Sequence, residues 1–212
     1  MDGFVAEGSI VRKIWGTADT VLFIFAGSAA EFAVNKAVDW LYFTGRLPTD
    51  PLGRLFSTMD YSRQIIFSPI DEALGAIDKI NAIHKAVEQS RGGAIPDWAY
   101  RDVLFMLIDY SIRAFEVLER KLSDEEKEEV FSVFSRVGQR MGLQGLPRNY
   151  PEWTVMRNEH LQQDTICSKL TADLFRQYRK HRGALRYLLL KQVQTVISPP
   201  RVKHLLGLSK IA

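Results

Sequence analysis

His84 is the residue of this 212-residue chain whose type and setting are best suited to binding a metal. It lies seven residues after Ile77 and four after Ile80, so a helix over residues 70–90 would turn its imidazole toward the apolar side. An inward imidazole can ligate a metal, although a hydrogen-bonded core histidine is the commoner case. The apolar stripe that defines this side consists of Ala73, Ala76, Ile77, Ile80, Ile83 and Val87.

Three more residues are candidates for a reaction site. Arg54 and Thr58 lie in the segment DPLGRLFST at residues 50–58, upstream of His84. Glu31 stands among alanines and Phe32, where a carboxylate would be desolvated unless it is paired. Such a group can act as an acid or base in a cavity, or it can pair with an arginine from another helix. Pairing is the favoured interpretation.

Other common site chemistries lack the residues that they need. The GxSxG and HExxH motifs are absent, and no histidine follows a glutamate at the spacing of a di-iron bundle. His160 could face the core but has polar neighbours, and His181 and His204 lie in a basic region where exposure is expected. Cys167 is the single cysteine, so the chain predicts neither an internal disulfide nor a zinc cluster.

The composition is that of a globular protein with one domain over residues 1–212. Apolar residues make up 46% of the chain and aromatic residues 11%, enough for a substantial core. The amino terminus lacks the basic and apolar regions of a secretory signal, so we expect a cytoplasmic location. Residues 21–38 are the most apolar stretch, but Glu31, Asn35 and Lys36 interrupt it, which predicts a buried core helix and not a membrane span.

Positive charge gathers at the carboxyl end. Residues 174–212 hold nine lysines and arginines and no acid, so against a total of +3 the first 173 residues carry −6. The basic, leucine-rich segment 184–212 fits peripheral contact with an anionic membrane, or a last helix with a solvated basic face. Because its basic residues are not interleaved with aromatic ones and match no known motif, we expect no nucleic-acid partner.

Helical periodicity recurs along the whole chain and predicts an all-α bundle of about eight helices. Asp50 and Pro51 are suited to beginning a helix, Ser123 to Glu126 forms a capping box, and Gly92 is suited to ending one. Within the predicted fifth helix Asp109 and Arg113 have the i, i+4 spacing of an ion pair. The expected helices span about residues 8–15, 19–43, 51 onward, 70–90, 97–121, 124–142, 151–182 and 184–196, with a short turn over 202–206.

Several segments together resemble a known family. They are SIVRKIWG at residues 9–16, DPLGRL at 50–55, IHKAV at 83–87, LIDYS at 107–111 and the closing PP to LGL at 199–208. In order and spacing they are similar to the family that contains the fungal MpaB oxygenase and the bacterial latex-clearing proteins, the rubber oxygenase catalytic domain. The likeness covers most of the chain.

This resemblance implies a globin-like helical fold that holds haem b and cleaves a carbon–carbon double bond of an isoprenoid with O₂. His84 matches the axial haem ligand of the latex-clearing proteins, and Arg54 and Thr58 match their Arg-x-x-Lys-Thr segment. Ser57 stands where those proteins carry a distal lysine, and Leu104 stands where many relatives have a histidine. These two departures concern the surroundings of the haem.

We therefore expect a haem b-dependent oxygenase with O₂ and an apolar isoprenoid or lipid substrate. His84 would ligate the iron, Arg54 and Thr58 would line the distal or propionate side, and Glu31 is a candidate base. The alternative is a non-catalytic helical module that binds a lipid or a partner in the same pocket without haem chemistry.

Overall fold

The computed structural model of the chain describes residues 3–43 and 51–208, without the side chains of residues 41, 51–57, 181, 182 and 184. Ten helices lie in this part: α1 (Ile10–Gly16), α2 (Ala18–Val34), α3 (Val38–Phe43), α5 (Pro51–Phe67), α6 (Ile70–Arg91), α7 (Asp97–Leu118), α8 (Asp124–Arg140), α9 (Tyr150–Gln163), α10 (Lys169–Ile197) and α11 (Pro200–Leu206). Over these residues two isolated bridges are the only β pairing. The all-α prediction is confirmed, with more helices than the eight expected.

Local sequence signals set several helix ends where they were predicted. At the start of α8, Ser123 and Glu126 cap each other's backbone N–H groups in a capping box. Pro51 is the first residue of α5, where its missing N–H costs nothing. Gly92 ends α6 with a φ of 73°, a left-handed conformation that glycine adopts without strain.

The helix expected over residues 19–43 is instead two helices, and tertiary hydrogen bonds explain the break. Asn35 turns the chain, and its side-chain oxygen accepts from the Ala37 N–H at 2.8 Å. The Lys36 N–H donates to the Asp164 carbonyl at 2.8 Å, and the Ile166 N–H donates to the Val34 carbonyl at 2.6 Å. The corner between α2 and α3 is thus fixed by the link that follows α9.

The carboxyl-terminal helices also differ from the expectation. The predicted helix over 151–182 is interrupted between α9 and α10, where Ser168 and Thr171 cap the start of α10. Helix α10 is kinked at Gly183, whose φ of 74° and ψ of 166° are not helical, so the boundary predicted at this glycine is confirmed. The short turn expected at 202–206 is the helix α11, which has Pro200 as its first residue.

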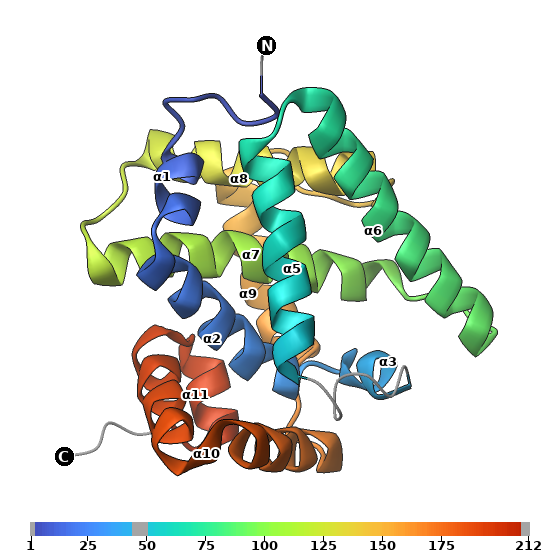
Figure 1. Cartoon of the computed structure of the whole chain (residues 1–212), viewed down its shortest axis with the longest axis vertical. Coiled ribbons are helices and arrows are strands. Elements are labelled where there is room, and N and C mark those ends of the chain that lie inside the picture. The colour runs from blue at the N-terminus through green and yellow to red at the C-terminus, as the bar shows by residue number, and fades with distance from the viewer. Residues whose placement is uncertain (1–2, 44–50, 209–212) are drawn as a thin grey trace.

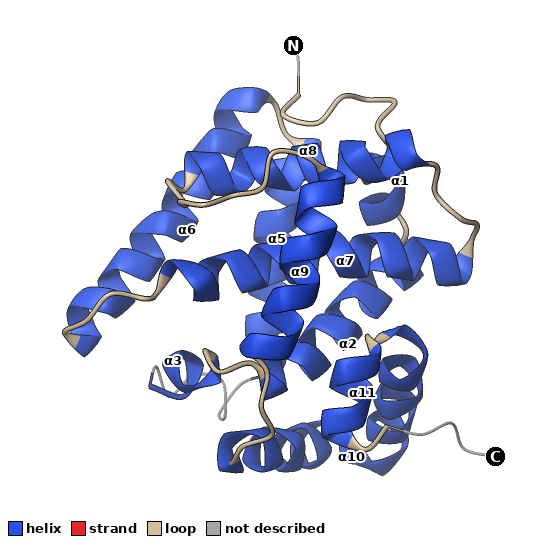
Figure 2. Ribbon diagram, turned by 180° about the vertical axis from the view of Figure 1, so that it is seen from behind, coloured by secondary structure: helices blue, strands red, loops and turns tan. Residues whose placement is uncertain are grey.

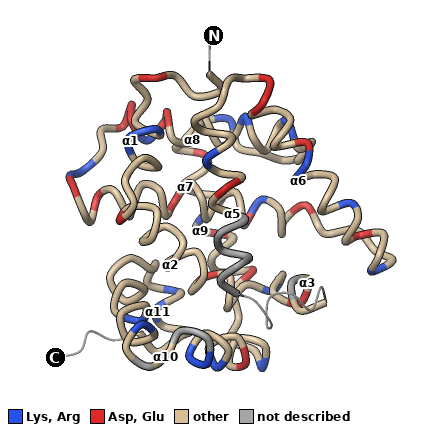
Figure 3. Tube along the Cα trace, viewed as in Figure 1, with Lys and Arg blue, Asp and Glu red and all other residues tan. Residues whose placement is uncertain are grey.

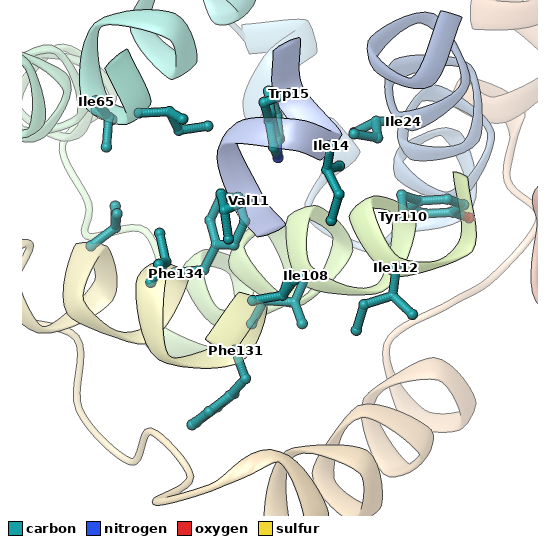
Figure 4. Packing of buried hydrophobic residues seen from close by; sticks show 14 of the residues in the cluster. Val11, Ile14, Trp15, Ile24, Ile65, Ile108, Tyr110, Ile112, Phe131 and Phe134 are labelled. Carbon is teal, nitrogen blue, oxygen red and sulfur yellow. The ribbon is translucent and has the colours of Figure 1, made fainter. Parts of the chain in front are cut away.

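Helix α7 crosses the middle of the molecule, with α5 on one side and α9 on the other (Figures 1 and 2). Its buried residues contact α1, α2, α8 and α9. In the largest apolar cluster the Trp15 ring meets the Phe25 ring edge-on at 5.9 Å, and its indole N–H donates to Ser111 at 3.1 Å. Figure 4 shows Trp15 of α1 among isoleucines of α2 and α7 and Phe134 of α8. Two smaller apolar clusters, around Leu174 and around Val202, accompany this one.

Helices α2 and α7 approach closely because Gly27 has no side chain. A Cβ atom at Gly27 would lie 2.2 Å from the Tyr110 ring of α7 and 3.1 Å from Ile197 of α10. The three helices therefore meet at this position, and Tyr110 is fully buried there.

No single helix in the described ranges has the length and apolar character needed to cross a membrane. The pair α1 and α2 meets those criteria only when the two helices are taken together, and they are bent by 86° relative to each other.

Candidate functional site

His84 lies on the side of α6 that is covered only in part by the rest of the protein. The fully buried residues of this helix, Ala73, Ala76 and Ile77, all belong to its first third. Further along, Ile80, His84 and Val87 are half-buried. Ile83 is 46% exposed, so its predicted place on the inward stripe was wrong. The inward direction of His84 itself is confirmed, on a face that remains partly open.

Tyr100 of α7 provides the aromatic wall beside His84. The two ring centroids are 5.1 Å apart with an interplanar angle of 61°. The Tyr100 hydroxyl donates to Glu88 of α6 at 3.2 Å, and the same carboxylate oxygen accepts from the Ile95 N–H at 2.8 Å. Burial, followed by the Glu88 carboxylate, raises the pKa of Tyr100, which keeps the phenol protonated as a donor. Glu88 thus joins α6 to the start of α7 and positions the His84–Tyr100 pair.

A second attachment holds the end of α6 against α3. Arg91 donates to the Asp39 carboxylate at 2.8 Å, and its guanidinium lies 3.8 Å from the centre of the Trp40 ring. An arginine stacked on an indole and paired with a carboxylate is well ordered. The carboxyl-terminal end of α6, beyond His84, is therefore attached to α7 through Glu88 and to α3 through Arg91.

The other residues predicted for this site lie on α5. Thr58 is exposed, and its backbone carbonyl accepts from the Ser62 hydroxyl at 3.0 Å. Arg54 and Ser57 belong to the same helix, but their side chains lie outside the described part of the chain. Helices α5 and α6 contact each other and diverge from the turn that joins them (Figure 1), with Thr58 in the first half of α5 and His84 in the second half of α6.

Glu31 is the centre of a buried ion-pair network elsewhere in the molecule. Its carboxylate accepts two hydrogen bonds from the Arg157 guanidinium, at 2.5 and 2.6 Å, and one from the Tyr110 hydroxyl at 3.0 Å. Arg157 also donates to Asp109 at 3.0 Å, and Asp109 accepts from Arg113 at 2.6 Å. Glu31 is 1% exposed and Arg157 is 4% exposed. Both predicted pairings, of Glu31 with an arginine from another helix and of Asp109 with Arg113, are confirmed.

The carboxylates of this network set the protonation states of Arg157 and Tyr110. Burial lowers the pKa of Arg157, but the Glu31 and Asp109 carboxylates outweigh it and raise that pKa, so the guanidinium stays charged. Burial and the Glu31 carboxylate raise the pKa of Tyr110, which keeps it a hydrogen-bond donor. The described hydrogen-bond partners of Glu31, Arg157 and Tyr110, both donate to its carboxylate. The geometry gives Glu31 a structural role, and its role as a base stays a prediction.

The network and the His84 pair are separate sites. Tyr100 and Asp109 lie nine residues apart on α7, which corresponds to roughly 14 Å along a helix axis. Leu104 lies between them in sequence, is 5% exposed and packs close to Gly138 of α8. Leu104 is thus an apolar core contact.

A further polar cluster joins α7, α9 and the corner after α2. Asp102 contacts His160 through the Nδ1 atom of the imidazole, and Asn35 donates to the other Asp102 oxygen at 2.6 Å. Asp164 lies 3.6 Å from the same Nδ1 atom. The three donor atoms of Asp102, His160 and Asp164 lie within 4.8 Å of one another, a set that could hold a cation.

Hydrogen bonding and nearby charges explain the same cluster without a metal. Burial and the Asp102 carboxylate raise the pKa of Asp164, while His160, Lys36 and Arg101 act on it in the opposite direction. Asp164 thus already has Lys36 and Arg101 as positive neighbours, and Asp102 is hydrogen-bonded to Asn35. The sequence indicated only that His160 could face the core, and it did not indicate Asp102 as a partner, because the two residues are 58 apart.

Comparison with known proteins identifies a family. Residues 13–212 match the family model described as "ER-bound oxygenase mpaB/B'/Rubber oxygenase, catalytic domain". No curated protein and no solved structure matches the chain. The globin-like arrangement of the core therefore stays a prediction.

Proposed function

Because the chain belongs to the family of the mpaB and rubber oxygenase catalytic domain, we propose that it is a haem b-dependent oxygenase. In this proposal it uses O₂ on a carbon–carbon double bond of an apolar substrate, an isoprenoid or another lipid. The family description supports the oxygenase class. One observation carries the haem assignment: His84 lies on a half-buried apolar face whose surroundings are fixed by Tyr100, Glu88 and Arg91.

The residues around His84 fit a haem in two respects. The donor is an imidazole, the commonest protein ligand of haem iron, and it stands between the aliphatic residues Ile80 and Val87. The face on which they lie is only partly covered by other helices, which leaves one side open to a flat apolar group. When bound, haem would supply the binding and activation of O₂.

The protein's own groups would then hold and shield that cofactor. His84 would be the axial ligand, and the Glu88–Tyr100 hydrogen bond would keep the imidazole in place by fixing the ring beside it. Arg54 is the candidate partner of a haem propionate, since guanidinium–carboxylate pairs are strong and directional. Thr58, four residues later on α5, would line the same side.

Absorption spectroscopy tests this function directly. Protein expressed with ample haem should show a strong Soret band, and the band should weaken in His84→Ala. The control is His204→Ala, an exposed histidine of α11, which should leave the band unchanged. Circular dichroism of both variants should match the wild type, so that a lost band reports ligation and not unfolding.

The alternative is a non-catalytic helical module that binds a lipid or partner in the same place. Leu104 favours it, because the resemblance implies a histidine at this position and the chain has a buried apolar residue there. A wild-type protein that stays colourless after haem reconstitution while it is fully folded would establish this alternative. A Soret band that is equally strong in wild type and His84→Ala would overturn the assignment of His84 alone.

A further inference from the structure

The second half of α10, after the kink at Gly183, carries an exposed apolar stripe. Leu185, Leu188, Leu189 and Val196 are 72%, 47%, 58% and 49% exposed. At about 100° per residue these four positions fall within roughly a third of the helix circumference. Scattered apolar side chains are normal on a protein surface, but four large ones aligned on one helix face form a continuous patch.

The opposite side of the same helix segment is fixed to the body of the protein. Leu190, Gln194 and Ile197 are buried, and the Gln194 side chain donates to the Ala26 carbonyl of α2 at 3.1 Å. The segment expected to present one apolar side therefore has two, an inner one in the core and an outer one in contact with solvent. Because the inner side is packed and hydrogen-bonded, the helix cannot turn to bury its outer stripe.

Positive side chains lie near this stripe, although the half-buried Lys191 has its ammonium 4.9 Å from the centre of the Phe175 ring. Arg186 and Lys191 fall on its two flanks by helical position, and Arg179 and Lys180 are exposed just before the kink. The chain has no acid after Asp173, which pairs with Arg176. Among the described residues, Arg179, Lys180 and Arg186 take part in no ion pair. Figure 3 shows the basic residues of α10 and α11 at one end of the molecule.

We propose that this face of α10 docks the protein onto an anionic phospholipid surface. The leucines and Val196 would enter the boundary between head groups and acyl chains, and the flanking cations would lie at the level of the phosphates. A second copy of the chain is a poorer occupant, since it would bring two acid-free basic faces together. A neutral bilayer would offer the apolar contact without the charge attraction. The proposal is independent of whether the protein binds haem.

Vesicle cosedimentation of the full-length protein tests the docking. Wild type should sediment with phosphatidylcholine vesicles that contain phosphatidylserine and stay in solution with phosphatidylcholine alone. The variant Leu185→Ser/Leu189→Ser should reduce the bound fraction about tenfold, since two apolar contacts are lost. The control is Val155→Ser on α9, a side chain that is 61% exposed away from the stripe, and it should bind like wild type.

A second variant separates the contribution of charge. Arg179→Gln/Arg186→Gln should weaken binding to the anionic vesicles and lessen its dependence on salt, because fewer charges are screened. Equal sedimentation of wild type with both vesicle types, or full binding by the leucine variant, would overturn the proposal. So would a stable dimer that the leucine variant converts to monomer while wild type ignores the vesicles.

Discussion

At the scale of single residues, the stability of the buried ion-pair network depends strongly on one side chain, Arg157. Arg157 is the only described positive group in contact with Glu31, and it also contacts Asp109. A buried ion pair adds little net stability over an apolar pair, but removing one member leaves an uncompensated charge in the core. Removing Arg157 alone should therefore cost more stability than the whole ion pair contributes relative to an apolar pair.

The variant Arg157→Met should lower the free energy of unfolding by about 3–5 kcal/mol, since it leaves the Glu31 carboxylate buried without its cation. The matched control is Arg113→Met. The Arg113 side chain also pairs with Asp109, but it is 38% exposed. That change should cost less than about 1 kcal/mol because solvent replaces the lost interaction. Urea denaturation measures both values, and similar losses in the two variants would contradict the role of burial.

The raised pKa of Asp164 predicts a pH dependence of stability. Burial and the Asp102 carboxylate raise its pKa above 3.8, so the folded protein holds this proton to higher pH than the unfolded chain does. The contribution of Asp164 to the free energy of unfolding should therefore fall as pH rises from about 3.8 through the raised pKa. Asp164→Asn should lose this fall and gain stability relative to wild type across that window. Denaturation curves at a series of pH values would refute this if wild type and variant stayed parallel.

At the scale of elements, the sequence predicts helices well where their ends are set locally. The starts of α5 and α8 and the end of α6 follow from Pro51, Ser123 and Gly92, each acting on its own neighbours. The break between α2 and α3 could not be predicted in this way. It depends on two hydrogen bonds with a segment about 130 residues later, one donated by the Lys36 N–H and one accepted by the Val34 carbonyl, which no local pattern contains.

Close packing between elements gives a prediction at Gly27. Replacing it with alanine would push a methyl group into the buried Tyr110 ring, so Gly27→Ala should cost about 1–3 kcal/mol of unfolding free energy. The control is Gly75→Ala in α6, where a Cβ meets nothing within 4 Å. That variant should gain about 0.5–1 kcal/mol from helix propensity. Thermal unfolding of the pair would show opposite shifts, and a stabilised Gly27→Ala would contradict the packing argument.

At the scale of the whole molecule, α7 contributes residues to two separate clusters along its length. Its first turns hold Tyr100 beside His84, and its middle holds Asp109 and Tyr110 in the ion-pair network. The sequence predicted that His84 faces inward and that Glu31 finds an arginine. It could not predict that these are different sites, nor which arginine is used, because Glu31 and Arg157 are 126 residues apart. Only the arrangement of α2, α7 and α9 decides that.

The same separation has a consequence for the order of events during synthesis. Helices α2 and α7 leave the ribosome before α9, so Glu31 and Asp109 are made long before Arg157. If α2 and α7 closed fully on each other at that stage, the Glu31 carboxylate would be enclosed without a cation, since Arg113 of α7 pairs with Asp109. The nascent chain should therefore keep this junction hydrated and loose until Arg157 arrives, which makes α9 the helix that completes the ion-pair network.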